Sequence, residues 1–418
     1  MDKENYRSFR YELVYTILYS VAFILVWHLP QLIILKVFNG PDILAVSVKS
    51  LGFIGIICVV FFSGFLSRYN RHKLFVTFGC LIAVLMFIIA MLPIETYREE
   101  SMYVFVGMII LCMLCVHFSE NARIAMWRIV YPEKLKGKIM AVFSGVASVL
   151  FLVSYPISEG FKNGIIGLQE AYLIGGLFML ASYLIYLKKG PVKGIEKLNV
   201  ASKEYHPIAQ LKSSFSIFKT DKEYLYYQIL QMIFGAGNIL LMLNRAVMVN
   251  STFADLSITD LAVIDIVIPT ALTIISVFFW GWFVDKVGPV KARIIAASSF
   301  VITWICFFIG LHLKDLNWIY ASSIASGFSV ANGQILWRLG HSYFSTPEND
   351  SKYFAVHQSL TGVRGLICGF LGLFLYTLIG NWVCLFTIIL ISITIPGYIK
   401  LDKLMMKNAA AKKEGNIE

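Results

Sequence analysis

The chain has 418 residues, of which 58% are hydrophobic and only 15% are charged. Soluble domains usually carry about 25% charged and 45–50% apolar residues, so this composition excludes an ordinary water-soluble protein. The 32 Phe and 21 Tyr exclude a disordered chain. Continuous apolar runs exclude an outer-membrane barrel, whose strands alternate. The remaining class is an all-α polytopic membrane protein.

Apolar runs of about 20 residues, the length that crosses a bilayer, occur twelve times. We place them near 12–37, 42–66, 73–94, 102–130, 137–159, 167–188, 222–249, 258–284, 291–313, 316–341, 352–379 and 381–401. We therefore predict twelve transmembrane helices in two pseudo-symmetric six-helix bundles. The predicted parts are an N-terminal bundle over 1–188, a cytoplasmic linker over 189–220, a C-terminal bundle over 221–404 and a cytoplasmic tail over 405–418.

The net charge of +11 comes from Lys and Arg that gather in alternate loops. Cytoplasmic loops carry such an excess, so we expect both termini to be cytoplasmic. We expect no nucleic-acid partner, because no basic segment is interleaved with aromatics. The seven Cys lie within apolar runs and indicate buried small side chains rather than disulfides. The expected partners are the lipid bilayer and a small-molecule substrate, and the expected state is a monomer.

Short motifs recur in the two halves of the chain. Trp127-Arg128 matches Trp337-Arg338 at the ends of spans 4 and 10. Further matches are Pro132-Glu133 with Pro347-Glu348, and Lys138-Ile-Met-Ala-Val with Lys352-Tyr-Phe-Ala-Val. Repeated halves are typical of secondary transporters, whose substrate site lies at the repeat interface.

Polar residues inside the spans indicate which helices are shielded from lipid, because a charge at mid-membrane costs about 2.5–3.5 kcal/mol on insertion scales. Spans 3, 6, 9 and 12 have no charged residue in their centres and are expected to face lipid. The candidate substrate-binding residues are His28, Gln31, His117, Asn121, Gln231, Asn238, Gln334, His357, Thr361 and Arg364.

Arg364 lies 12 residues after Lys352, or about 18 Å into its span. It either belongs to the transport pathway or is held by a structural partner such as Asp265. On span 7, one helical face forms either a cavity wall or polar contacts that join helices. That face contains Gln228, Gln231, Gly235, Asn238, Met242 and Arg245.

The candidate proton-coupling residues are His117, Glu120 and Asp265. The spacing of Glu120 and Arg123 also fits a packed cluster that neutralises itself. In span 1, Pro30 interrupts the helix between His28 and Gln31, which gives either a hinge at a binding site or a kink without function. Cys112 and Cys115 precede His117, but no second Cys/His cluster completes a metal site, so we expect no metal and no cofactor.

The loop between spans 8 and 9 reads Gly281-Trp-Phe-Val-Asp285-Lys286-Val-Gly288. It resembles the Gly-x-x-x-Asp-Arg/Lys-x-Gly signature of the major facilitator superfamily. The equivalent loop of the first half keeps Arg68 and Arg71 but has Ser67 where the family has Asp. The resemblance extends over essentially the whole chain, to an unassigned, bacterial-looking subgroup.

This resemblance implies a multi-pass protein of the bacterial inner membrane. It would be a secondary active transporter that moves a small polar or anionic organic solute by alternating access, with H⁺ as the expected coupling ion. An enzyme would need a nucleophile next to a general base, and the sequence does not indicate such a pair, so we do not expect an enzyme. The alternatives are a transport-inactive sensor or an integral membrane enzyme of the same fold. The loop residues expected to act in gating, or simply to anchor the loops, are Ser67, Arg68, Arg71, Asp285, Lys286 and Gly288.

Overall fold

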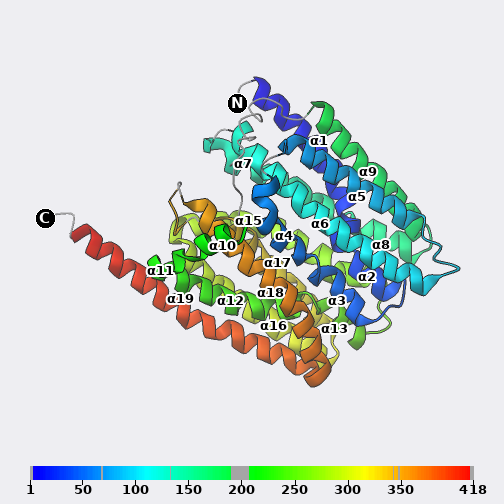
Figure 1. The fold of residues 1–418 in the computed structure, drawn as a ribbon. Helices are drawn as coiled ribbons and strands as arrows, with labels where there is room; N and C mark the ends of the chain where they lie inside the picture. Colours follow the sequence, from blue (N-terminus) through cyan, green and yellow to red (C-terminus); the bar gives the residue numbers. More distant parts are fainter. Residues whose placement is uncertain are drawn as a thin grey trace. The chain divides into compact units, whose positions relative to one another are not determined.

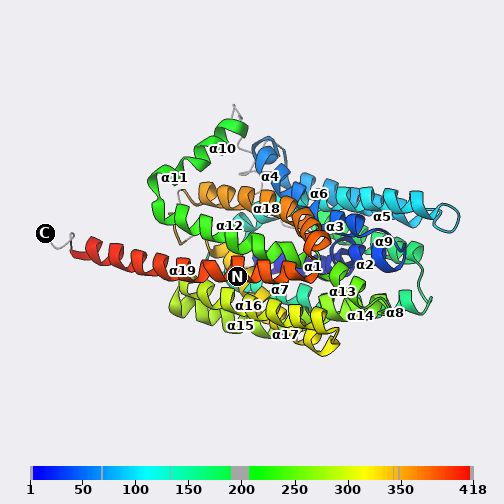
Figure 2. The same ribbon diagram turned by 90° about the horizontal axis from the view of Figure 1, so that it is seen from below.

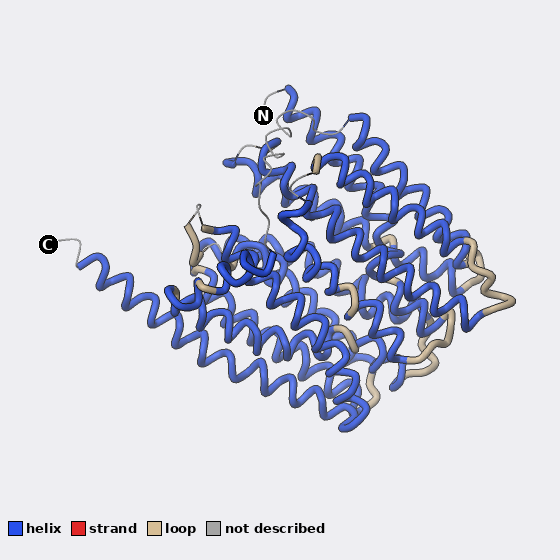
Figure 3. The backbone as a smooth tube through the Cα atoms, viewed as in Figure 1, coloured by secondary structure: helices blue, strands red, loops and turns tan. Residues whose placement is uncertain are grey.

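A computed structural model describes residues 3–66, 69–131, 133–189, 207–341, 343–346 and 349–414. The regular structure within these ranges is helical, without strands (Figure 3). Ten stretches of the described chain are long and apolar enough to cross a bilayer, which confirms the polytopic helical class. One of them, Lys352–Asn408, runs through two long helices. The number twelve therefore stays a prediction.

The chain packs as two compact units. Unit 1 consists of Met1–Ile208 with Ala254–Thr270, and unit 2 consists of Ala209–Phe253 with Ala271–Glu418. The segment Ala254–Thr270, which follows the predicted linker by more than thirty residues, thus packs with the first unit. The predicted bundle and linker boundaries themselves stay predictions.

Unit 1 is a bundle in which α5 packs against α6 and α9, and α1 packs against α7 and α9 (Figure 1). Tyr15, Phe75, Tyr183 and Tyr186 form its aromatic core, with ring centroids 4.6–5.5 Å apart. Its elements are α1 (Lys3–Phe23), π-helix η1 (Ile24–His28), α2 (Pro30–Lys36), α3 (Asp42–Ser50), α4 (Phe53–Leu66), α5 (Arg71–Ala90), α6 (Arg98–Val130), α7 (Glu133–Phe151), α8 (Ser154–Lys162), α9 (Leu168–Lys189), α14 (Ile258–Ala262) and π-helix η3 (Val263–Val267).

In unit 2, α12 packs against both α18 and α19, and Figure 2 shows it between them. Helix α16 packs against α17 and α19. The elements are α10 (Pro207–Phe215, whose first two residues belong to unit 1), α11 (Ile217–Thr220), α12 (Lys222–Met242), α13 (Arg245–Thr252), α15 (Ile268–Val287, whose first turn belongs to unit 1), α16 (Pro289–Leu313), α17 (Leu316–Leu339), α18 (Asp350–Ile379), 3-10 helix η4 (Gly380–Trp382) and α19 (Val383–Glu414). Most of the predicted linker, 190–206, lies outside the described residues.

The interruption predicted in span 1 is confirmed. The N–H of Leu29 bonds to the carbonyl of Ile24, five residues back, at 2.9 Å, and Pro30 has no N–H with which to continue an α-helix. Helix α2 therefore restarts at Pro30. A second π-helix, η3, contains Asp265 and precedes Pro269 in the same way. Such single π-turns are frequent at functional sites.

Candidate functional site

A buried ion-pair network joins α1 and α6 of unit 1. The Nε atom of Arg123 donates to Oε1 of Glu12 at 2.7 Å, and Nη1 donates to Oε1 of Glu120 at 2.8 Å. Its Nη2 donates to the Thr16 hydroxyl at 3.2 Å. The pairing expected between Glu120 and Arg123 is thus confirmed. Two carboxylates thus share one guanidinium.

Glu12 is the member of this network that the sequence analysis missed. Its side chain is 0% exposed, although it belongs to the polar N-terminal stretch. The available signal was its place at the start of an apolar run, with Thr16 one turn later on the same helical face. No local spacing relates it to Arg123, which lies 111 residues further along the chain.

Aromatic rings surround the Arg123 guanidinium. Its Cζ atom lies 4.6 Å from the ring centroid of Tyr15 and 4.5 Å from that of Trp127. Tyr131, just beyond the end of α6, is also buried. Burial and the nearby Glu12 carboxylate raise the pKa of the Tyr131 hydroxyl well above its usual value. Tyr131 is therefore a neutral neighbour of the network.

The other predicted residues of the first half lie elsewhere in unit 1. The imidazole of His117 packs so closely on Gly55 that a Cβ atom there would overlap it. His28, at the end of η1, has its ring 4.5 Å from that of Phe151. Gln31 is buried in α2, and Asn121 is half-buried in α6. The roles of these four residues stay predictions.

Arg364 lies inside unit 2, where α18 packs on α12. Its side chain is almost fully buried, and Nη1 donates to the backbone carbonyl oxygen of Gln231 at 2.5 Å. The guanidinium lies directly against Gly235, where a Cβ atom would overlap it. The glycine one turn after Gln231 thus gives the arginine access to a carbonyl of α12. Among the described residues, Nε of Arg364 has no acceptor.

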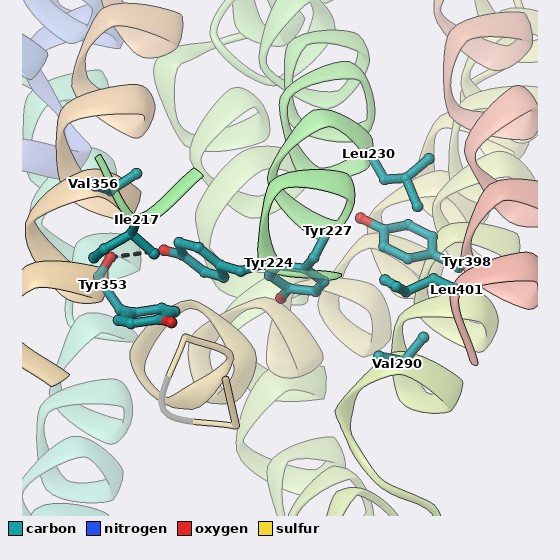
Figure 4. Close-up of a cluster of buried hydrophobic side chains, with 9 residues drawn as sticks. All are labelled: Ile217, Tyr224, Tyr227, Leu230, Val290, Tyr353, Val356, Tyr398 and Leu401. Carbon is teal, nitrogen blue, oxygen red and sulfur yellow. Dashed lines mark hydrogen bonds between the residues drawn. The ribbon is translucent and has the colours of Figure 1, made fainter. Parts of the chain in front are cut away.

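Two further predicted residues, Gln231 and His357, adjoin Arg364. The Gln231 side chain accepts a hydrogen bond from the Tyr398 hydroxyl at 2.9 Å. Nδ1 of His357 lies 3.4 Å from the Gln228 amide nitrogen. Because an amide nitrogen only donates, Nδ1 accepts and the neutral ring has its hydrogen on Nε2. Figure 4 shows Tyr224, Tyr227 and Tyr398 in the apolar cluster next to this region.

The polar face of span 7 joins helices within unit 2. Gln228 contacts α18, Gln231 contacts α19, and the Asn238 side chain accepts from Trp304 of α16 at 3.2 Å. Arg245 is buried and donates to the Ser323 hydroxyl of α17 at 2.6 Å. Such contacts are expected if this face forms polar contacts that join helices, which was one of its two interpretations. The substrate-binding roles of Gln231 and Asn238 stay predictions.

The remaining candidates in unit 2 have simpler surroundings. The Thr361 hydroxyl donates to the His357 backbone carbonyl at 2.8 Å, and Gln334 is exposed. Asp265 belongs to unit 1, so the alternative in which it holds Arg364 stays a prediction. Among the described residues, no three potential metal ligands lie together.

The predicted gating loops differ between the two halves. Asp285 and Lys286 are exposed, and Nζ of Lys286 lies 5.0 Å from the ring centroid of Trp282. Gly288 has φ +82°, a conformation that favours glycine. In the first loop, Arg71 is buried, whereas Ser67 and Arg68 lie outside the described residues. The latch role of these residues stays a prediction.

Asn70, at the position where the family signature has Gly, caps α5. Its side-chain oxygen accepts from the Lys73 N–H at 3.1 Å, and its φ of −61° is ordinary. A left-handed turn, which would explain a glycine there, does not occur at this residue. Helix capping accounts for Asn70 instead.

Comparison with known proteins gives a family and a fold. The family model described as Major Facilitator Superfamily matches residues 11–363. The structure resembles the nucleoside transporter NupG (TM-score 0.68, 13% identity, 96% of this chain and 99% of that one). It also resembles a POT family transporter in complex with a thioalcohol-conjugated peptide (0.69, 11%, 96% and 96%) and a bacterial homologue of the human lysosomal transporter Spinster (0.65, 11%, 95% and 97%). A search of curated proteins finds no match.

Proposed function

The chain belongs to the Major Facilitator Superfamily and is therefore a multi-pass membrane transporter rather than an enzyme, and we propose that it moves a small anionic organic solute by alternating access, coupled to H⁺. The proposed place is the bacterial inner membrane, with both termini cytoplasmic and the protein a monomer. The likenesses to solved structures support the fold alone, since all are below 25% identity.

The buried guanidinium of Arg364 is the observation that carries the proposal of an anionic solute. Within the described chain it bonds to a backbone carbonyl and has no carboxylate partner. A charged side chain inside a membrane protein is costly, and such residues usually mark a transport pathway. A carboxylate or phosphate group of the solute would supply the counter-charge, because guanidinium groups match these oxyanions well.

The proposal of proton coupling rests on the two carboxylates that share Arg123 in unit 1. Glu12 and Glu120 both bond to Arg123, so protonation of either one would leave a neutral ion pair. Glu120, His117 and Asp265 are the candidate proton-coupling residues from the sequence, and Glu12 is added by the structure. Entry of a proton with an anion would also reduce the charge moved across the membrane.

Uptake by reconstituted vesicles tests the proposed function. The wild-type protein should accumulate at least one of a panel of radiolabelled mono- and dicarboxylates and phosphate esters, and more so with a pH gradient. Arg364→Ala should abolish uptake yet insert normally. The exposed Arg7 provides a matched control, because Arg7→Gln removes an arginine that only stacks on Tyr11, 5.9 Å from its ring centroid.

Normal uptake by Arg364→Ala would remove this residue from the mechanism. A wild-type protein that moves none of the anions, but moves neutral or cationic solutes, would refute the anionic solute. Movement of no solute of any charge would favour the transport-inactive sensor.

A further inference from the structure

Arg293, in the first turns of α16, follows the basic loop between spans 8 and 9, but the structure buries it inside unit 2. The residue is only 2% exposed. Its Cζ atom lies 5.7 Å from the ring centroid of Phe234, and its Nε atom has no acceptor among the described residues. An arginine that anchors a loop in water would be exposed, so its position requires another explanation.

Arg293 and Arg364 lie against the same turn of α12. Arg293 stacks on Phe234, while the guanidinium of Arg364 lies on Gly235 and bonds to the Gln231 carbonyl. The two guanidinium groups are also close enough to interact electrostatically with each other and with His357. Two helices, α16 and α18, thus bring two cations to one turn of a third helix.

This group contains donors but no described acid. Cys368, Tyr398, Arg293 and Tyr227 act electrostatically on Arg364, and Arg364, His341 and Arg293 act on His357. Within the described chain, neither arginine has a carboxylate at ion-pair distance. Nε of Arg293, Nε of Arg364 and Nε2 of His357 are three buried N–H groups without an acceptor in the described structure. An oxyanion with two negative charges would neutralise both guanidinium groups and accept from these donors.

We propose that Arg293 and Arg364 together bind the doubly charged anionic part of the transported solute, and that Arg293 makes the site prefer dianions to monoanions. This inference rests on the proposed function for the statement that the ligand is the transported solute. His357 would add a neutral donor through Nε2. The ligand must have two negative charges within reach of both guanidinium groups, either on one phosphate group, as in a phosphate monoester, or on the two carboxylates of a short dicarboxylate.

Anion binding to the purified protein in detergent tests this directly. Thermal unfolding is followed during titration with succinate, inorganic phosphate or acetate at pH 8 and constant ionic strength. The wild-type protein should bind succinate or phosphate at least tenfold more tightly than acetate. Binding of succinate but not of phosphate would indicate a dicarboxylate site. Binding of phosphate but not of succinate would indicate a phosphate site.

The variants separate the two arginines. Arg293→Gln should reduce the dianion preference to about onefold while acetate still binds, and Arg293→Lys should restore part of it, since it keeps the charge. Arg364→Gln should weaken the binding of all three anions, and the exposed-site control Arg7→Gln should bind them like the wild type. A wild-type protein without dianion preference, or an Arg293→Gln protein that keeps it, would overturn the inference.

Failure of this inference can be told apart from failure of the proposed function. If acetate and succinate bind equally and Arg364→Gln still abolishes both binding and uptake, Arg293 has no selective role but the anion transporter stands. If Arg364→Gln changes neither binding nor uptake, the proposed function fails as well. Because the wild-type preference alone can refute the inference, the test remains decisive even if Arg293→Gln does not fold.

Discussion

Unit 1 and unit 2 both bury arginines, but they surround them differently. In unit 1, Arg123 has two carboxylate partners, a hydroxyl and two aromatic rings. In unit 2, Arg293 and Arg364 have a ring and a backbone carbonyl, and no described carboxylate. The Arg123 network therefore has two acids for one base, whereas the group of Arg293 and Arg364 has two bases and no described acid.

This difference teaches that a buried charge alone does not identify a binding site. Removing one member of a buried, hydrogen-bonded ion pair leaves its partner uncompensated, so single substitutions in the Arg123 network are expected to destabilise the protein. An arginine without a carboxylate partner contributes little to the stability of the empty protein and is available to a ligand. Four substitutions test the contrast, and all are read from unfolding of the purified protein in detergent.

The largest loss of stability is expected from Arg123→Gln. It leaves Glu12 and Glu120 buried without their cation, and we expect the free energy of unfolding to fall by about 3–5 kcal/mol. Arg123→Lys should recover part of the loss, because lysine keeps the charge but not the planar fork. A loss below about 1 kcal/mol would show that the two carboxylates do not depend on Arg123.

Glu12→Gln should lower the free energy of unfolding by less, about 1.5–3 kcal/mol, because Arg123 keeps Glu120 as its partner. Glu159→Gln is a suitable control, since its pair with Lys162 is partly exposed and 3.9 Å long, and such pairs contribute about 0–1 kcal/mol. The double variant Glu12→Gln/Arg123→Gln should be more stable than Arg123→Gln alone. If it is less stable, Glu12 is not the carboxylate that Arg123 neutralises.

Gly235→Ala should destabilise unit 2 by about 1–2 kcal/mol, because the added methyl group would push the buried Arg364 guanidinium away from the Gln231 carbonyl to which it donates. Gly333→Ala in α17 is the matched helix-interior control. No atom lies within 4 Å of a Cβ placed at Gly333, so this change should be neutral or stabilise by up to about 1 kcal/mol. Equal effects of the two substitutions would contradict the close approach of Arg364 to α12.

The smallest effect is expected from Arg293→Gln, within about 1 kcal/mol of the wild type in the absence of anions. The substitution removes a stacked cation but leaves no described carboxylate unpaired. A loss of 3 kcal/mol or more would reveal an acidic partner and would place Arg293 in the same class as Arg123.

Much of the class and part of the site could be predicted from the sequence. Apolar run lengths indicate a polytopic helical protein, and depth within a span predicts that Arg364 is buried. The spacing of three residues predicts the Glu120–Arg123 pair. Glu12 could not be linked to Arg123, because only the packing of α1 on α6 brings them together. The burial of Arg293 could not be predicted, because counts of basic residues near loops do not distinguish a helix-start arginine that faces water from one that turns inward.

Unit 1 is built from two separate segments of the chain, and this affects how the protein can be divided into fragments. A fragment that ends at Ile208 lacks Ala254–Thr270, and with it α14, η3 and Asp265. Expressing the first half by itself would therefore expose apolar surface that this later segment covers on α8 and α2. Synthesis on the ribosome meets the same situation, since the first unit stays unfinished until part of the second has been made.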